Sequence, residues 1–311
     1  MKIASLLPSC TEIAYALGLG DNIIGVSHEC DFPEQAKSKP VLTKSKINPL
    51  GKSDQIDKEV LNIVKQGLSV YDIYEDKLKE LNPDLILTQD QCEVCAVSLK
   101  DVQQAVKKSI CNAKIISLQP ETLQNILNNI ITIGKQTYKE QEAQELIKNL
   151  KSRINYIERK TEYLTNKPKV CVIEWIEPLM IAGNWVPELI EIAGGVNIIS
   201  EHGKHSPKTK IEKILDYQPD KIIITPCGFK VYQTINDLDF LTEKPEWNQL
   251  NAVKNNEVYI IDGNAYLNRP SQRIVDTLEI LASIIHPKLF TEKRELSFKF
   301  NELILQSPQN L

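Results

Sequence analysis

The chain contains an internal repeat, and this repeat constrains the fold more than any other feature of the sequence. A glutamate lies six residues before a glycine and ahead of an Asn-Ile-Ile segment at Glu12–Gly18, and the same pattern returns at Glu188–Gly194. A second pattern, Pro-Asp followed by an apolar run, occurs at Pro83 and at Pro219, each with an acidic residue seven positions earlier. Two patterns that recur in the same order predict two similar halves.

Both halves have the local sequence pattern of an α/β fold. Each Glu-to-Gly segment is typical of a short helix whose glutamate complements the positive helix N-terminus and which the glycine ends. Short apolar runs alternate with helical segments, as in parallel sheets that helices cover on both faces. These runs are 3–7, 23–26, 85–88, 114–117, 170–175, 222–225 and 258–261. The sequence therefore predicts two Rossmann-like lobes with mainly parallel sheets.

One long helix is expected between the lobes. Apolar residues recur at helical spacing from Ala143 to Leu164, without an internal Gly or Pro, and predict a stiff helix from about Tyr138 to Leu164, roughly 40 Å long. One arm of a coiled coil is the weaker interpretation, because fewer than four heptads are present. The predicted organisation is a lobe over 1–120 with an insertion at 43–73, helices over 121–166, a second lobe over 167–287, and a polar tail over 288–311. We expect this tail to contain a helix near Glu292–Leu305 and to pack on the surface or fray.

Composition excludes several classes of partner. The net charge of −4, without a basic stripe, argues against nucleic acid, and no apolar run approaches the roughly 20 residues that span a bilayer. Seven cysteines without regular spacing favour a reducing compartment, and the first residues lack the apolar stretch of a signal peptide. We expect a cytoplasmic monomer from the sequence as it stands. Lipidation at Cys10 is the alternative, although the apolar run that it requires is missing.

Candidate ligand contacts follow the strands, because open α/β sheets bind ligands at the carboxyl ends of their strands. Aromatic faces together with paired guanidinium groups suit a large flat ligand with amide or carboxylate edges. As single features, the tryptophans could equally fill a core and the arginines could form an ordinary surface pair. The candidates are Pro8, Ser9, Cys10, Thr11, His28, Glu29 and Gln91 in the first half, and Trp175, Trp185, Tyr266, Arg269, Ser271 and Arg273 in the second.

A metal site in the first half is an open alternative. Cys92 and Cys95 form a Cys-x-x-Cys pair, and with Cys30 and His28 they could bind zinc or iron. Such a cluster would suit a cytoplasmic metal-dependent or thiol-dependent enzyme on the same scaffold. The plainer interpretation is that these cysteines are buried and free. Nucleotide-binding glycine motifs are absent from the sequence, which gives an enzyme of the common nucleotide-dependent kinds no support.

Several segments together resemble one family. Ser5-Leu-Leu-Pro-Ser-Cys-Thr-Glu12, Ala193-Gly-Gly-Val-Asn-Ile198 and Arg269-Pro-Ser-Gln-Arg273 are similar to cobalamin-binding proteins of ABC importers, within the periplasmic iron-siderophore and cobalamin binding superfamily. The resemblance implies two lobes hinged on a rigid helix, a corrinoid such as cobalamin or a related metal chelate bound in the cleft between them, no enzymatic activity, and a periplasmic or cell-surface location.

The same resemblance implies a partner and contains one departure. Asp76 and Glu212 match the carboxylates that dock onto membrane subunits of the importer, although either could instead be an ordinary charge at a helix N-terminus. Where the family has an aromatic residue, this chain has His28-Glu29-Cys30. His28 could therefore be an axial ligand to the cobalt of a corrin or the iron of a haem.

Overall fold

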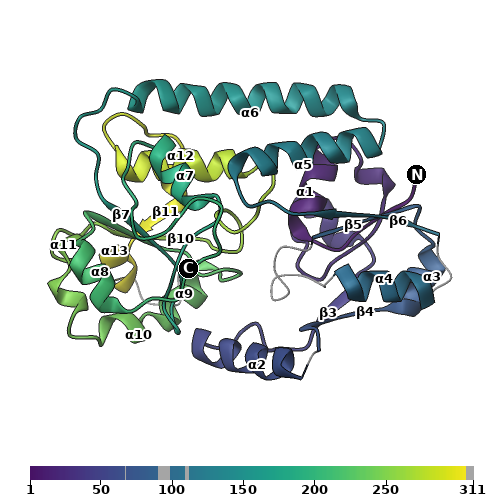
Figure 1. Cartoon of the computed structure of the whole chain (residues 1–311), viewed down its shortest axis with the longest axis horizontal. Helices are drawn as coiled ribbons and strands as arrows, with labels where there is room; N and C mark the ends of the chain where they lie inside the picture. Colours follow the sequence, from purple (N-terminus) through teal and green to yellow (C-terminus); the bar gives the residue numbers. More distant parts are fainter. Residues whose placement is uncertain (67, 90–98, 109–111, 306–311) are drawn as a thin grey trace. The chain divides into compact units, whose positions relative to one another are not determined.

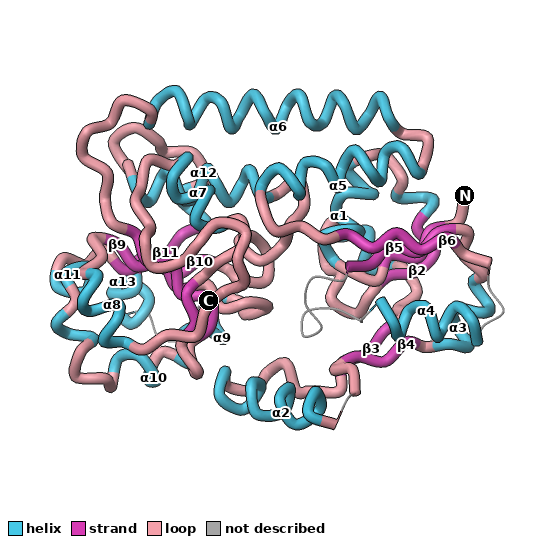
Figure 2. The backbone as a smooth tube through the Cα atoms, in the orientation of Figure 1, coloured by secondary structure: helices cyan, strands magenta, loops and turns pink. Residues whose placement is uncertain are grey.

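The computed structural model describes residues 1–66, 68–89, 99–108 and 112–305 and divides the chain into two compact units (Figures 1 and 2). Unit 1 comprises Met1–Gly51, Ile56–Pro120 and Gln124–Asn149. Unit 2 comprises Lys52–Gln55, Glu121–Leu123 and Leu150–Leu311. Each unit has its own sheet and hydrophobic core, as the repeat predicts.

Unit 1 contains a parallel four-stranded sheet. Its order is β2 (Ile23–Val26), β1 (Ile3–Ser5), β5 (Leu85–Gln89) and β6 (Lys114–Leu118). One face packs on α3 (Glu75–Leu81) and α4 (Leu99–Lys108) through Ala4, Leu78, Ile86 and Val102. Since β1 lies between β2 and β5, cleavage before Cys10 would remove an interior strand, which argues against the lipidation alternative. Unit 1 also contains α1 (Pro8–Ala16), η1 (Gly20–Asn22), η2 (Glu34–Ser38) and most of α5 (Leu123–Gln136).

The predicted insertion forms a substructure of its own. Strands β3 (Thr43–Ser45) and β4 (Tyr71–Ile73) pair in antiparallel register, with α2 (Ser53–Lys65) between them in the sequence (Figure 2). Thr43 lies opposite Ile73, and Ser45 lies opposite Tyr71. Sequence periodicity gave no sign of these strands, because three-residue strands are too short to show alternation.

Unit 2 contains a mixed five-stranded sheet. Its order is β11 (Ser297–Lys299), β10 (Val258–Ile261), β9 (Lys221–Ile224), β7 (Val170–Trp175) and β8 (Met180–Ile181). The three inner strands are parallel, and the two edge strands run antiparallel to their neighbours. The helices of this unit are α7 (Val186–Ile192), α8 (Ile211–Tyr217), α9 (Val231–Asp237), α10 (Asp239–Thr242), η3 (Trp247–Gln249), α11 (Asn251–Lys254), α12 (Ile274–Ile285), η4 (Arg294–Leu296) and α13 (Phe300–Leu305).

The Pro-Asp repeat has the same hydrogen bonds in both units. Asp84 accepts the backbone N–H of Lys2 at 2.7 Å, and Asp220 accepts that of Lys169 at 2.8 Å. The backbone N–H of each aspartate donates in return to the carbonyl of the same lysine, at 2.9 and 2.8 Å. Each aspartate therefore fixes the start of one strand against the next, which explains why the motif occurs twice.

The Glu-to-Gly repeat is confirmed at its glycines but only half confirmed at its glutamates. Gly18 and Gly194 both have positive φ, +73° and +81°, and both follow a helix. Glu188 lies in the first turn of α7, as predicted. Glu12 does not lie in the first turn of α1, because this helix begins earlier, at Pro8, so the expected interaction with the helix N-terminus is wrong for Glu12.

The long helix is present but shorter than predicted. Helix α6 (Glu140–Thr161) has 22 residues and a length of about 33 Å at 1.5 Å per residue. The predicted start at Tyr138 is wrong because this residue has a φ of +57° and belongs to a turn. The helix starts in unit 1 and continues into unit 2 after Asn149. No helix of the described ranges combines the length and apolarity needed to cross a membrane.

The C-terminal segment contains part of the predicted helix, as α13, but it packs into the core of unit 2 and is not a surface tail. Strand β11 pairs with β10 at the edge of the sheet, and α13 follows it directly. Phe300 and Leu303 are buried in the core of unit 2, where the rings of Phe300 and Trp247 lie 5.9 Å apart. Residues 297–303 therefore complete unit 2, because their apolar side chains cover a face of the sheet that would otherwise meet water.

Candidate functional site

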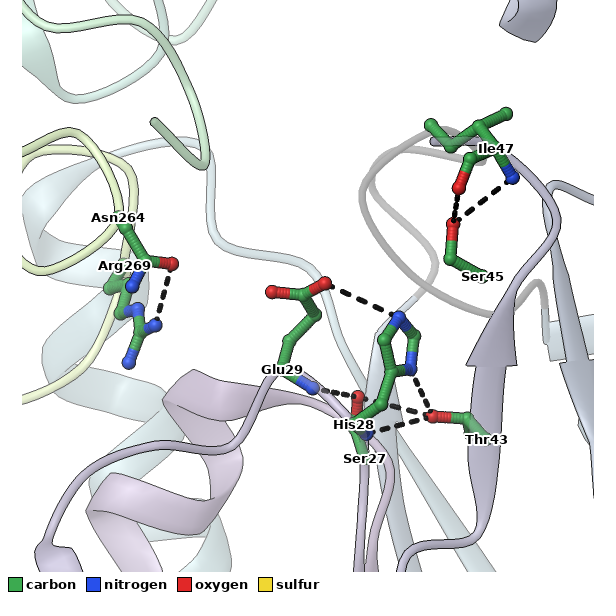
Figure 3. A network of polar contacts seen from close by, with 8 residues as sticks. All are labelled: Ser27, His28, Glu29, Thr43, Ser45, Ile47, Asn264 and Arg269. Carbon is green, nitrogen blue, oxygen red and sulfur yellow. Dashed lines mark hydrogen bonds and ion pairs between the residues drawn. The ribbon is translucent and has the colours of Figure 1, made fainter. Parts of the chain in front are cut away.

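A polar network occupies the carboxyl end of β2 in unit 1. Nδ1 of His28 lies 2.7 Å from the Thr43 hydroxyl, which also accepts the backbone N–H of His28 at 3.1 Å. The Thr43 hydroxyl donates to Oγ of Ser27 at 3.3 Å, and Ser27 Oγ accepts the backbone N–H of Glu29 at the same distance. Figure 3 shows the imidazole of His28 between the Thr43 hydroxyl and the Glu29 carboxylate.

The second nitrogen of His28 lacks a hydrogen-bond partner among the residues that the structure describes. Nε2 is shielded from solvent and makes no hydrogen bond within the described part of the chain, although Oε1 of Glu29 lies 3.3 Å away. The imidazole also contacts the ring of Tyr71, with 5.3 Å between the ring centroids. Thr43 and Tyr71 were both missed by sequence reasoning, since only the pairing of β3 with β4 brings them to His28.

The predicted contacts at residues 8–11 are not in a loop. They form the first turn of α1, with Pro8 at the start, and Ser9, Cys10 and Thr11 are buried. The Thr11 hydroxyl donates to Ser5 Oγ at 2.7 Å and lies 3.1 Å from Cys30 Sγ. These polar groups therefore have partners inside unit 1.

The buried thiol of Cys10 is poorly suited to catalysis. Cys10 Sγ points to the carbonyl of Thr88 at 3.8 Å, and burial raises the pKa of this thiol far above its ordinary value. A reactive cysteine instead needs a lowered pKa and access to solvent. This observation gives the thiol-enzyme alternative no support at Cys10.

The predicted metal cluster is described only in part. Gln91, Cys92 and Cys95 lie outside the described residues. Within 1–66, 68–89, 99–108 and 112–305, no three His, Cys, Asp or Glu side chains come together as a metal site. Of the four predicted ligands, Cys30 is buried beside Thr11, and His28 belongs to the polar network at the end of β2.

Aromatic side chains gather at the carboxyl ends of β7 and β9 in unit 2. Trp175 ends β7, is partly exposed, and packs edge-on against Phe229 with 5.2 Å between ring centroids. Its indole N–H donates to the carbonyl of Glu177 at 3.2 Å, which fixes the ring. A partly exposed and oriented indole can present a flat apolar face to a ligand.

The second predicted tryptophan has a different environment. Trp185 is 6% exposed, and its indole N–H donates to the carbonyl of Leu267 at 2.9 Å. The structure therefore places Trp185 in the interior of unit 2, where it fastens the segment after β10 to the start of α7. Burial of this kind depends on tertiary packing and has no signature in the local sequence.

The segment after β10 is held by side-chain contacts to its own backbone. Asp262 accepts the backbone N–H groups of Asn264 and Ala265, each at 2.9 Å. The buried Arg269 donates from Nη2 to Oδ1 of Asn264 at 2.9 Å (Figure 3). Gly263 is required here, because a Cβ atom would lie 2.0 Å from the carbonyl oxygen of Pro226. The Asp-Gly-Asn sequence directly after a strand was the available signal for this turn.

The other predicted residues of this segment are brought near one another. The guanidinium of Arg273 lies 4.8 Å from the ring centroid of Tyr266. Ser271 is buried and accepts the backbone N–H of Arg273 at 3.2 Å. Arg269 and Arg273 thus differ in environment, since the first is buried and bonded to Asn264 while the second is stacked on a partly exposed ring.

The two predicted docking carboxylates occupy equivalent positions. Asp76 lies in the first turn of α3, Glu212 lies in the first turn of α8, and both are exposed. Each helix ends at a residue in the left-handed conformation, Asn82 or Gln218, just before its Pro-Asp motif. The repeat therefore presents one exposed carboxylate at the same place in each unit.

Two α/β units joined by a long helix, with aromatic and cationic side chains beyond the carboxyl ends of parallel strands, define a two-lobed solute-binding protein. The profile described as "Periplasmic binding protein" matches residues 3–265, and the chain belongs to this family.

Two relatives and one solved structure are consistent with membership of this family. A vitamin B12-binding protein of Vibrio cholerae serotype O1 is 26% identical over 281 residues, which cover 89% of this chain and 86% of the relative. An uncharacterised ABC transporter substrate-binding lipoprotein of Bacillus subtilis is 25% identical over 296 residues, which cover 94% of this chain and 82% of the relative. The crystal structure of the periplasmic vitamin B12 binding protein of Vibrio cholerae superposes with a TM-score of 0.66 at 23% identity, over 91% of this chain and 96% of that one.

Proposed function

We propose that this solute-binding protein takes a corrinoid, such as cobalamin, as its ligand and delivers it to the membrane subunits of an ABC importer. The similarity to the vitamin B12-binding protein of Vibrio cholerae, which spans 89% of this chain, carries the proposal. The proposal implies that the protein works on the outer side of a cell membrane, as is usual in the family. This location differs from the cytoplasm, which the cysteine content favours.

The side chains at the strand ends of unit 2 support a flat ligand. The partly exposed indole of Trp175 offers a broad apolar face, and it is already oriented by its hydrogen bond to Glu177. The Arg273 guanidinium on Tyr266 offers donors for the amide oxygens at the edge of a corrin ring. Because these groups are fixed before binding, little conformational entropy is lost when the ligand arrives.

Titration of cyanocobalamin into the protein tests the ligand. All three tryptophans, Trp175, Trp185 and Trp247, lie in unit 2, so tryptophan fluorescence reports binding to that unit. Trp175→Ala should weaken binding about tenfold, equivalent to roughly 1.4 kcal/mol of lost ring contact. Tyr163→Ala, at an 82% exposed tyrosine beyond α6, is the matched control and should bind like the native protein.

The proposal fails if cyanocobalamin does not bind at micromolar concentration. Equal binding by the native protein and Trp175→Ala would leave the corrinoid in place but would remove Trp175 from its contacts.

The importer-docking role of Asp76 and Glu212 is part of the proposal. Their equivalent positions on α3 and α8 suit a partner with two matching cationic sites. The double variant Asp76→Lys/Glu212→Lys should bind cyanocobalamin normally and yet lose stimulation of importer ATP hydrolysis in reconstituted vesicles. The control double variant Glu80→Lys/Asp216→Lys changes the same charge on the same two helices at exposed positions and should keep the stimulation.

A further inference from the structure

We infer that Nε2 of His28 is an axial ligand to the metal at the centre of the bound ligand, and that Thr43 is the positioning residue that makes this nitrogen available. The inference rests on the proposed function, because it requires a ligand with a metal ion at its centre. It assigns a role to the segment in which this chain departs from the family it resembles, His28-Glu29-Cys30.

The hydrogen bonds of Thr43 determine where the imidazole carries its proton. The Thr43 hydroxyl has one proton, which it donates to Ser27 Oγ at 3.3 Å. Toward Nδ1 of His28, at 2.7 Å, the hydroxyl therefore acts as an acceptor, and a neutral imidazole places its proton on Nδ1. Nε2 then keeps a free lone pair, which is the state that a metal ligand requires.

The orientation of the ring is fixed from two sides. The Thr43 hydroxyl contacts both Nδ1 and the backbone N–H of His28, and Thr43 is only 1% exposed. The ring of Tyr71 packs against the imidazole at a 48° angle. Thr43 and Tyr71 come from β3 and β4, so the small antiparallel sheet of the insertion supplies both supports.

Because Nε2 is shielded from solvent in the structure, the inference requires the neighbouring Glu29 side chain to turn away when the ligand binds. Its carboxylate lies 3.3 Å from Nε2 without forming a hydrogen bond there, and the side chain is 39% exposed. A carboxylate beside an unprotonated nitrogen gains little, so rotation into solvent costs little. After a metal cation binds to Nε2, a nearby carboxylate becomes favourable, because opposite charges then face each other. Figure 3 shows this carboxylate beside the imidazole edge that carries Nε2.

Two forms of the same corrinoid test the assignment. Aquocobinamide carries a water molecule on cobalt(III) that a nitrogen ligand can replace, whereas both axial positions of dicyanocobinamide are held by cyanide. Binding to His28 is a ligand exchange in which the Nε2 lone pair forms a bond to cobalt and the water leaves, without any change of oxidation state. The visible spectrum of the corrin ring reports this exchange directly.

The native protein should shift the visible spectrum of aquocobinamide, and His28→Ala should bind it without that shift. Thr43→Val should bind aquocobinamide about tenfold to a hundredfold more weakly, the usual effect of losing the hydrogen bond behind a metal-ligating histidine. Ser45→Ala is the matched control, because the Ser45 hydroxyl hydrogen-bonds to the backbone of Ile47 in its own segment, and this variant should behave like the native protein. Dicyanocobinamide should bind equally to all four proteins, which also verifies their folding.

An unshifted spectrum with the native protein, or the same shift with His28→Ala, overturns the inference while dicyanocobinamide binding upholds the corrinoid. Equal affinities of Thr43→Val and native protein for aquocobinamide overturn the role of Thr43. Absence of binding by both cobinamides refutes the corrinoid ligand and the axial assignment together.

Discussion

Replacing Arg153 should show how strongly α6 is fastened to α12 inside unit 2. Arg153 donates to Glu279 from Nε at 2.7 Å and from Nη2 at 2.6 Å, and it donates to Asp276 from Nη2 at 2.6 Å. Its hydrogen bonds to the carboxylates of Glu279 and Asp276 raise the pKa of Arg153 above its ordinary value, so the group stays charged. Arg153→Met keeps most of the aliphatic stem and removes these three bonds.

The expected cost lies between those of a surface pair and a buried pair. The side chains of Arg153, Asp276 and Glu279 are 30%, 20% and 17% exposed. Exposed ion pairs contribute about 0–1 kcal/mol, and breaking a buried pair costs about 3–5 kcal/mol. Lys293 remains 3.1 Å from Asp276, so Glu279 is the carboxylate that loses its partner. We expect Arg153→Met to lower the free energy of unfolding of unit 2 by about 2 kcal/mol, roughly a thirtyfold change in the equilibrium constant.

Urea unfolding followed by tryptophan fluorescence measures this cost, because the tryptophans all lie in unit 2. The double variant Arg153→Met/Glu279→Gln should recover part of the loss, since it removes the unpaired carboxylate together with its partner. A loss below about 0.5 kcal/mol, or strictly additive single losses, would show that solvent screens the network and that our reasoning about its burial is wrong.

Three further changes test other parts of the structure. Gly263→Ala should lower the melting temperature of unit 2, since its Cβ would lie 2.0 Å from the Pro226 carbonyl oxygen, and an unchanged melting temperature would contradict the close approach. Burial raises the pKa of Cys171 from 9.0 to about 12, so this thiol ionises at a lower pH in the unfolded chain than in the folded one. The free energy of unfolding should therefore fall as the pH rises from about 9. Cys171→Ala should make that fall in the urea midpoint shallower, and an identical fall would exclude the thiol as a cause. A chain ending before Ser297 lacks β11 and α13 and should unfold at lower urea concentration with Trp247 fluorescence shifted to the red, whereas a native midpoint would restore the tail interpretation.

Local sequence patterns were sufficient to predict the parallel strands of both sheets and the helix between the two halves. The seven predicted strands are all present, and 23–26, 170–175 and 258–261 have the predicted bounds. Runs of this kind are apolar because both faces of a parallel sheet are covered, so the signal is local. The Pro-Asp repeat was equally visible, because each aspartate bonds to the start of a neighbouring strand and must keep its position relative to that strand.

Site environment was less predictable than site position. Trp175 and Trp185 both follow strands in unit 2, and the sequence gave no way to tell them apart. One is partly exposed beside Phe229, while the other is enclosed with its N–H bonded to Leu267. The difference depends on which segments pack over each ring, and those segments are more than 50 residues away in the chain.

The amino-acid sequence by itself determined the duplication, the strands, the helix between the halves and the family. Each of these features depends on the spacing of residue types and of apolar side chains among near neighbours in the chain. Only the tertiary structure decided that residues 297–299 complete a sheet, that Cys10 and Trp185 are enclosed, and that Thr43 and Tyr71 support His28. These outcomes depend on contacts between distant segments, and such contacts leave no pattern in the residues on either side.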